Sequence, residues 1–211
     1  MKNIFLKTFA IIATVSLIFS FTTLPKIQSL KIGKKAPMTS HKMKDVSGLD
    51  LSLEDLAFEN GVLVVFSCNS CPFVVGNNEM EGWQGRYNDL HEICKLNKIG
   101  MVLVNSNEAK RNSADSYTDM QKHSKEEKYN SAYVIDKNSE LADAFGASTT
   151  PHVFLLDSEF KLIYKGAIDD NVKSKSSVKS NWVKDAVIST GKNEPISLAE
   201  TRNSGCSIKR L

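Results

Sequence analysis

Two cysteines that stand three residues apart are the side chains of this sequence best suited to chemistry. Cys68 and Cys71 lie in the stretch VVFSCNSCPF, after an apolar, β-branched run and directly before Pro72. Two thiols at this spacing can close a small disulfide ring and open it again without moving the fold. The spacing by itself fits a redox couple, half of a metal site or a structural staple.

The elements expected around the pair favour a redox couple. The run VLVVF at 62–66 is continuous and apolar, as in a strand buried on both faces. Apolar residues then recur at three- and four-residue steps, which predicts a helix with one buried face: Trp83, Tyr87, Leu90, Ile93 and Cys94. We expect Cys68 at the start of this helix, where backbone N–H groups lower its thiol pKa. Cys71, one turn further, is then the shielded thiol that resolves a mixed disulfide.

The rest of the chain predicts an α/β domain built on one mixed sheet. Further strands are expected at 101–104, 131–135, 152–157 and 160–166, and helices at the end of 105–128, at 140–145 and at 181–189. The last two strands flank Asp157 and Ser158, which are turn residues, and so predict an antiparallel hairpin. The expected architecture is a central mixed β-sheet flanked by helices.

The N-terminus has the pattern of a secretory signal. Lys2 and Lys7 precede an uncharged, mostly apolar run that ends at Leu24. Because a bilayer span needs about 20 apolar residues, we expect 1–24 to be a signal peptide or an N-terminal membrane anchor. The mature chain is then periplasmic or otherwise extracytoplasmic, where disulfides persist, and it meets a membrane only through this segment if the segment is uncleaved.

Length and charge argue for one domain without a nucleic-acid partner. The chain has 211 residues, with 27 basic and 24 acidic side chains, and loss of Lys2 and Lys7 would leave 25 against 24. This balance gives no surplus of positive charge for a polyanion. We expect a spacer at 25–37, one domain at 38–192 and a C-terminal tail at 193–211.

Four motifs make the sequence resemble thioredoxin-fold proteins of the peroxiredoxin-related redoxin (AhpC/TSA) family. They are Cys68-Asn69-Ser70-Cys71-Pro72, Asn105-Ser106-Asn107, Thr150-Pro151 and the tail Gly205-Cys206-Ser207-Ile208-Lys209. The resemblance implies a thioredoxin fold and an exported thiol-disulfide oxidoreductase with Cys68 as nucleophile. It also implies that Pro151 is a cis-proline facing the pair and that Thr150 binds an extended substrate segment. Protein thiols or disulfides and a membrane or periplasmic redox partner are the implied partners, with no cofactor and no metal.

Two departures from the family pattern change what the resemblance implies. Thioredoxins keep a buried aspartate in the strand before the motif, whereas the strand here has no acid, which leaves Glu79 and Glu81 as candidate proton acceptors. Relatives also often carry a histidine where Ser70 stands. Without that cation, we expect a couple more reducing than that of a histidine-bearing relative.

Other functions stay open at this stage. A peroxiredoxin-like thiol peroxidase is disfavoured because its threonine, three residues before the reactive cysteine, is replaced by Val65. A copper carrier would need His152 beside the pair, and a non-catalytic module would keep its disulfide closed. Cys94 is expected to be a buried, inert thiol. Cys206 is expected to pair with Cys94, to act as a third redox thiol or to remain free, near a flexible C-terminus.

Overall fold

Residues 28–211 are described by the computed structural model, so the predicted signal or anchor at 1–24 lies outside the described residues. Strand β3 (Val62–Ser67) is the inner strand that leads to the cysteine pair, and all six of its residues are buried. It pairs in parallel with β4 (Gly100–Asn105), which pairs in parallel with β5 (Ala132–Ile135). On its other side β3 pairs with the antiparallel strand β7 (His152–Leu156).

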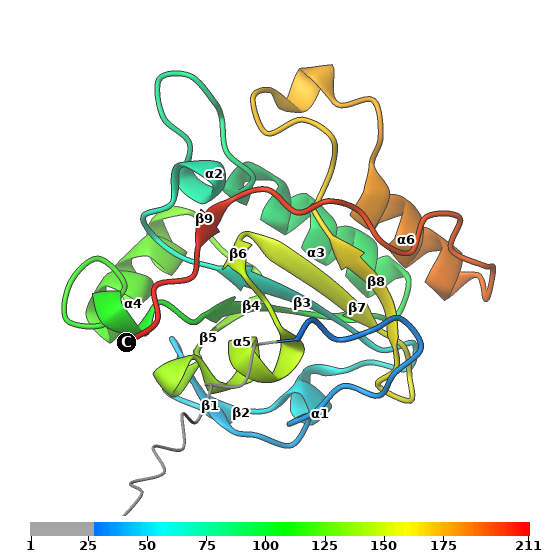
Figure 1. The fold of residues 1–211 in the computed structure, drawn as a ribbon, viewed down its shortest axis with the longest axis horizontal. Coiled ribbons are helices and arrows are strands. Elements are labelled where there is room, and N and C mark those ends of the chain that lie inside the picture. The colour runs from blue at the N-terminus through cyan, green and yellow to red at the C-terminus, as the bar shows by residue number, and fades with distance from the viewer. Residues whose placement is uncertain (1–27) are drawn as a thin grey trace, which may run out of the picture.

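These strands belong to a seven-stranded sheet in the order β2-β1-β5-β4-β3-β7-β8 (Figure 1). The remaining strands are β1 (Met43–Asp45), β2 (Asp50–Leu51) and β8 (Leu162–Gly166), and β6 (Thr149–Thr150) pairs with β9 (Cys206–Ser207) in a separate two-stranded sheet. The hairpin predicted around Asp157 is the β7–β8 pair. The sheet and its helices confirm the predicted thioredoxin fold.

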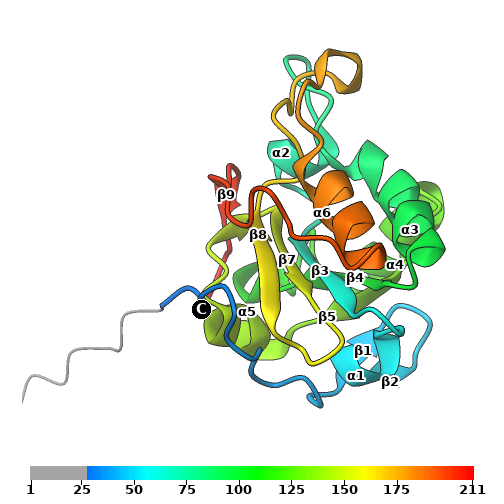
Figure 2. The ribbon, with the colours of Figure 1, turned by 90° about the vertical axis from the view of Figure 1, so that its right-hand side faces the viewer.

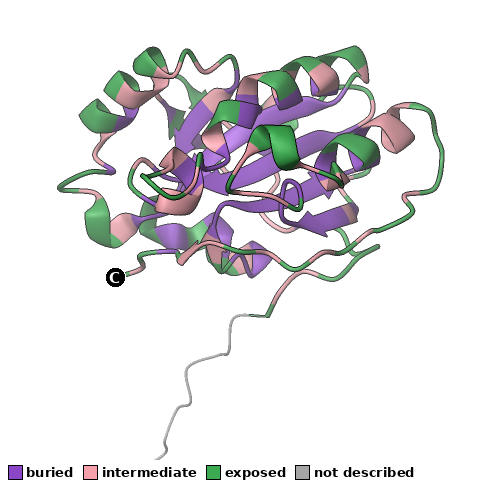
Figure 3. Cartoon of the chain, turned by 90° about the horizontal axis from the view of Figure 1, so that it is seen from above, coloured by how far each residue is buried: buried purple, intermediate pink, exposed green. Residues whose placement is uncertain are grey.

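Alternating strand residues form two cores, one on each face of the sheet. One core packs Leu63 and Val65 against α3 (Tyr87–Leu96), α4 (Tyr117–Glu126) and α6 (Trp182–Gly191). The other packs Val64 and Phe66 against α1 (Leu53–Leu56) and α5 (Glu140–Phe145). Figure 2 shows the helices on either side of the sheet, and Figure 3 shows the strands buried between them. Burial on both faces explains why these strands are continuous apolar runs.

The helix expected to begin at the cysteine pair is interrupted, which corrects the prediction of a single helix. Helix α2 (Pro72–Val75) ends after four residues, and the chain resumes helical structure at η1 (Gln84–Arg86) and α3. Gly76 and Gly82 both have positive φ, and a Cβ on Gly82 would lie 2.4 Å from the backbone nitrogen of Gly76. The two glycines thus close a loop that no other residue type fits.

Both ends of the described chain pack against the domain. The N–H of Leu30 donates to the carbonyl of Phe145 at 2.9 Å, and that of Ala36 donates to Phe160 at 2.7 Å, so residues 28–37 are not a free spacer. The C-terminal segment crosses the molecule from α6 to β9 (Figure 1) and ends beside α5 (Figure 2), where Arg210 pairs with Asp143 at 2.6 Å. The expectation of a flexible tail is wrong, because Ile208 is only 5% exposed and packs in the core around α5.

Besides η1, the described part of the chain contains 3₁₀ helices at η2 (Glu108–Lys110), η3 (Lys137–Ser139) and η4 (Lys175–Ser177). Within residues 28–211, no helix has the length and apolar character needed to cross a membrane.

Candidate redox site

The cysteine pair lies between the end of β3 and the start of α2. Cys68 follows the last residue of β3, and Cys71 is the N-cap residue of α2, with Pro72 in the first turn. The prediction that Cys68 begins the helix is therefore wrong, since Cys71 holds that position. Both residues are buried, with exposed fractions of 1% for Cys68 and 4% for Cys71.

Thr150 and Pro151 face the pair. The Thr150–Pro151 bond is cis, as the family resemblance implies. The hydroxyl oxygen of Thr150 lies 3.3 Å from the sulfur of Cys68, and the sulfur of Cys71 lies 3.1 Å from the carbonyl oxygen of Thr150. The structure thus brings together the four residues that the sequence singled out.

The two thiols differ strongly in acidity. The pKa of Cys71 is lowered to about 5, first by the hydrogen bond from the Cys68 thiol and further by the thiol and backbone N–H of Cys206, against the opposing effect of burial. The pKa of Cys68 is raised well above its usual value, because its proton is shared with Cys71 and because it is buried. The reduced pair therefore carries its negative charge on Cys71, where the sequence predicted it on Cys68.

This difference predicts the pH dependence of the reduced protein. Because the pKa of Cys71 is about 5, one thiolate per chain is expected to be present above that pH and to be lost as the pH falls through it. Thiolate absorbance in the near ultraviolet measures this directly. The Cys71→Ser variant should lack the transition, and a first thiolate that forms only near the ordinary value of about 8.5 would contradict the assignment.

A buried carboxylate, Asp115, holds the loop between the two cysteines. It accepts from the N–H of Asn69 at 2.8 Å, and its other oxygen lies 3.5 Å from the hydroxyl of Ser70. The side-chain amides of Asn105 and Asn107 donate to the same carboxylate at 2.8 and 3.1 Å. The sequence reasoning missed Asp115, which is one acid in a polar, charged segment, and its only signal was the nearby Asn-Ser-Asn motif.

The candidate proton acceptors on the other side of the motif do not approach the sulfurs. Glu79 is exposed, and the carboxylate of Glu81 accepts from the backbone N–H of Lys175 at 2.6 Å. Ser70 has the carboxylate of Asp115 as its neighbour at 3.5 Å, where a relative with histidine at this position would carry a cation. The more reducing couple expected from Ser70 stays a prediction, and the lowered pKa of Cys71 acts against it by stabilising the reduced form.

The C-terminal tail covers the pair. In the β6–β9 pairing Cys206 lies opposite Thr150, and its backbone N–H donates to the sulfur of Cys71 at 3.4 Å. Gly205 passes so close to the carbonyl oxygen of Thr150 that a Cβ would lie 2.3 Å from it. The tail is tied to the second motif as well, because the N–H of Lys209 donates to Asn107 at 2.9 Å. All four motifs therefore meet at one site.

The remaining cysteine, Cys94, and His152 are both buried in the fold. Cys94 is fully buried on α3, and burial raises its pKa to about 12, which fits the expected inert thiol. His152 is buried in β7, where its Nδ1 accepts from the N–H of Ser148 at 3.3 Å. Burial lowers the pKa of His152 to about 4, so the ring is neutral at pH 7. Among the described residues, no three His, Cys, Asp or Glu side chains cluster as metal ligands would.

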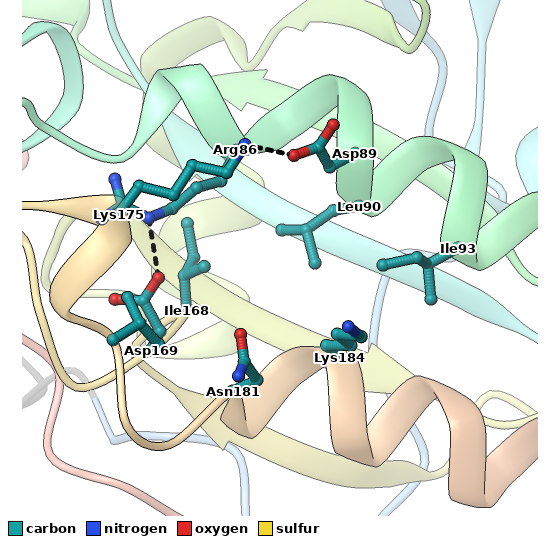
Figure 4. A pocket seen from close by; sticks show the side chains of 10 residues that line it. Arg86, Asp89, Leu90, Ile93, Ile168, Asp169, Lys175, Asn181 and Lys184 are labelled. Atoms are coloured by element: carbon teal, nitrogen blue, oxygen red, sulfur yellow. Dashed lines mark hydrogen bonds and ion pairs between the residues drawn. The ribbon is translucent and has the colours of Figure 1, made fainter.

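A separate pocket lies between α3 and α6 (Figure 4). Four of its charged side chains form two ion pairs, Arg86 with Asp169 at 2.7 Å and Lys175 with Asp89. The described cysteines take no part in lining it.

Comparisons with known proteins agree with the fold. The AhpC/TSA family matches residues 32–165. An uncharacterized conserved protein from Geobacillus kaustophilus is 27% identical, with a TM-score of 0.77, over 86% of this chain and 93% of its own. A hypothetical protein from Sinorhizobium meliloti is 25% identical, with a TM-score of 0.76, over 87% of this chain and 97% of its own.

More distant structures share the fold alone. The peroxidoxin BcpB from Mycobacterium tuberculosis is 14% identical, with a TM-score of 0.54, over 78% of this chain and 97% of its own. No curated protein matches the chain.

Proposed function

Because this chain belongs to the AhpC/TSA family of thioredoxin-like proteins, we propose that it is an extracytoplasmic thiol-disulfide oxidoreductase that uses Cys68 and Cys71 on protein thiols. The observation that carries the proposal is the contact of both sulfurs with Thr150, beside the cis bond to Pro151. A structural staple would not need one of its sulfurs held as a thiolate.

The acidity of the pair assigns the two roles in the reducing direction. The Cys71 thiolate attacks a substrate disulfide, a mixed disulfide forms, and the other substrate sulfur leaves as a thiolate. Cys68 then loses its proton and attacks the Cys71 sulfur, which closes the Cys68–Cys71 disulfide and releases the second substrate thiolate. These roles are the reverse of those expected from the sequence, because hydrogen bonds from Cys68 and then from Cys206 lower the pKa of Cys71.

The proposed reaction needs an oxidising compartment and a partner that exchanges electrons with the pair. A signal or anchor at 1–24 would deliver the protein to an oxidising compartment, where a reduced pair needs a steady supply of electrons. A membrane or periplasmic thiol partner would supply or accept them. The proposal needs no cofactor, since the electrons stay on sulfur throughout.

Reduction of insulin by dithiothreitol, followed as turbidity, tests the proposal. The wild-type protein is expected to accelerate the reaction, because the Cys71 thiolate is preformed at pH 7. Cys94→Ala is the matched control, since that cysteine is buried in the apolar core of α3 and should leave the rate unchanged. An accelerated rate that is the same for wild type and for a Cys68→Ser, Cys71→Ser double variant would rule the couple out.

A thiol peroxidase is the second candidate, and the same lowered pKa favours it. A thiolate at the N-cap of a helix is also what attack on a peroxide requires. Peroxide consumption driven by dithiothreitol separates the two activities. Consumption without insulin reduction would favour the peroxidase, and insulin reduction without consumption would favour the oxidoreductase.

A further inference from the structure

Cys71 has two sulfur neighbours. The Cys68 thiol lies on one side of it, and the Cys206 thiol and N–H lie on the other. Because the Cys206 backbone nitrogen is 3.4 Å from the Cys71 sulfur, the two side chains are within the reach of one rotation about the Cα–Cβ bond of Cys206. The chain therefore carries three thiols in a row, with Cys71 in the middle.

The tail is held at this place by its backbone, as an extended peptide would be. β9 pairs in antiparallel register with β6, Thr149 opposite Ser207 and Thr150 opposite Cys206. The N–H of Ile208 donates to the carbonyl of Ser148 at 3.1 Å, and its side chain is buried. Main-chain pairing of this kind is how extended segments bind to exposed strand edges.

We propose that the tail is an intramolecular substrate, in which Cys206 forms a disulfide with Cys71 that alternates with the Cys68–Cys71 disulfide. The proposal rests on the proposed thiol-disulfide exchange at this pair and extends it to a third catalytic thiol. The tail residues from Gly205 to Ile208 then occupy the same edge of β6 that a protein substrate would use.

The exchange balances without an external oxidant. In the oxidised protein the Cys206 thiolate attacks the Cys71 sulfur, the Cys71–Cys206 bond forms, and the Cys68–Cys71 bond breaks. Cys68 leaves as a thiolate and takes up the proton that Cys206 gave up. The disulfide has moved and no electrons have entered or left the protein.

The exchange carries the disulfide from a closed site to the surface. Cys68 and Cys71 are nearly inaccessible beneath the tail, whereas Cys206 is half-buried. A partner thiolate would attack the Cys206 sulfur and release Cys71, since the pKa of Cys71 is about 5 and that of Cys206 is raised to about 11, and the more acidic thiol leaves faster. The tail thus gives a partner thiol a second route to the couple, through the more exposed Cys206, while the tail is in place.

Oxidation of the full-length Cys68→Ser variant with oxidised glutathione tests the proposal. Trypsin leaves Cys71 in the peptide 45–86, Cys94 in 87–95 and Cys206 in 203–209, so mass spectrometry identifies the pairing. We expect the loss of two free thiols per chain and a link between 45–86 and 203–209. The Cys68→Ser, Cys206→Ser double variant should instead carry one glutathione on Cys71. The same glutathione adduct in both variants, without a link, would overturn the proposal.

A pair of glycine variants tests whether the tail must lie against Thr150 for the Cys71–Cys206 link to close. Gly205→Ala places a Cβ 2.3 Å from the Thr150 carbonyl oxygen, whereas a Cβ at Gly85 meets nothing within 4 Å. In the Cys68→Ser background, Gly205→Ala is expected to slow closure of the Cys71–Cys206 link about tenfold, a change of about 1.4 kcal/mol in the barrier. Gly85→Ala should leave the closure rate unchanged. Equal closure rates in the two variants would contradict this placement of the tail against Thr150.

The two proposals fail in different ways. If only the intramolecular substrate is wrong, the wild type still reduces insulin and no linked peptide forms in Cys68→Ser. If only the proposed oxidoreductase function is wrong, the linked peptide forms and insulin reduction by the wild type equals the uncatalysed rate.

Discussion

Cys71→Ser is expected to lower insulin reduction by about a thousandfold or more, to the uncatalysed rate, because the variant has lost the nucleophile itself. Cys71 holds the thiolate and is the sulfur with which both Cys68 and Cys206 can pair. Cys68→Ser keeps that thiolate and loses the resolving thiol. It should therefore form mixed disulfides with substrate but turn over slowly, and gel electrophoresis without reductant detects these species.

The matched comparison makes Cys68→Ser and Cys71→Ser as two separate variants, each in a Cys206→Ser background. The thiol of the tail is then absent and cannot resolve the trapped mixed disulfide. There, Cys68→Ser is expected to accumulate mixed disulfides and Cys71→Ser is not. Accumulation with Cys71→Ser alone would restore the roles expected from the sequence, with Cys68 as the attacking thiol.

Asp115→Ala is expected to lower the free energy of unfolding by about 3 kcal/mol, because it leaves several buried donors without an acceptor. Those donors are the N–H of Asn69 and the side-chain amides of Asn105 and Asn107. Urea unfolding of the reduced protein measures the loss. Asp50→Ala, at an exposed carboxylate on β2, serves as control and should stay within about 0.5 kcal/mol of wild type.

The Asp115→Ala variant should also change the ionisation of the cysteine pair, which a purely structural role of Asp115 would leave unchanged. The charge of Asp115 contributes to the raised pKa of Cys68, so its removal should lower the pH at which the second thiol of the pair ionises. An unchanged second ionisation together with unchanged stability would show that Asp115 does not hold the motif.

The sheet was predictable because its strands are buried on both faces. Val62 to Phe66 and the runs at 101–104 and 132–135 carry apolar or aromatic side chains at every position, and the structure places them in β3, β4 and β5. The helix after Pro72 was not predictable, since the break at Gly76 and Gly82 depends on a close backbone approach that periodicity does not encode.

The site was predictable only in part, for similar reasons. Cys68, Cys71, Thr150 and Pro151 stand in recognisable motifs, and the structure brings them together. Asp115 lies 46 residues after Asn69, and the tail pairs with β6 through two-residue strands. Strands so short leave no alternation in the sequence, so their pairing emerges only from the folded chain.

The most direct test of the account is a redox titration of the Cys68–Cys71 pair in the Cys206→Ser variant. The protein is equilibrated in glutathione buffers, quenched with acid and alkylated, and the internal disulfide of the peptide 45–86 is quantified by mass spectrometry. The account predicts one reversible two-electron transition, in which the ratio of disulfide to dithiol changes tenfold for about 30 mV. A disulfide that never opens across the titration, or glutathione adducts in place of a Cys68–Cys71 disulfide, would contradict it.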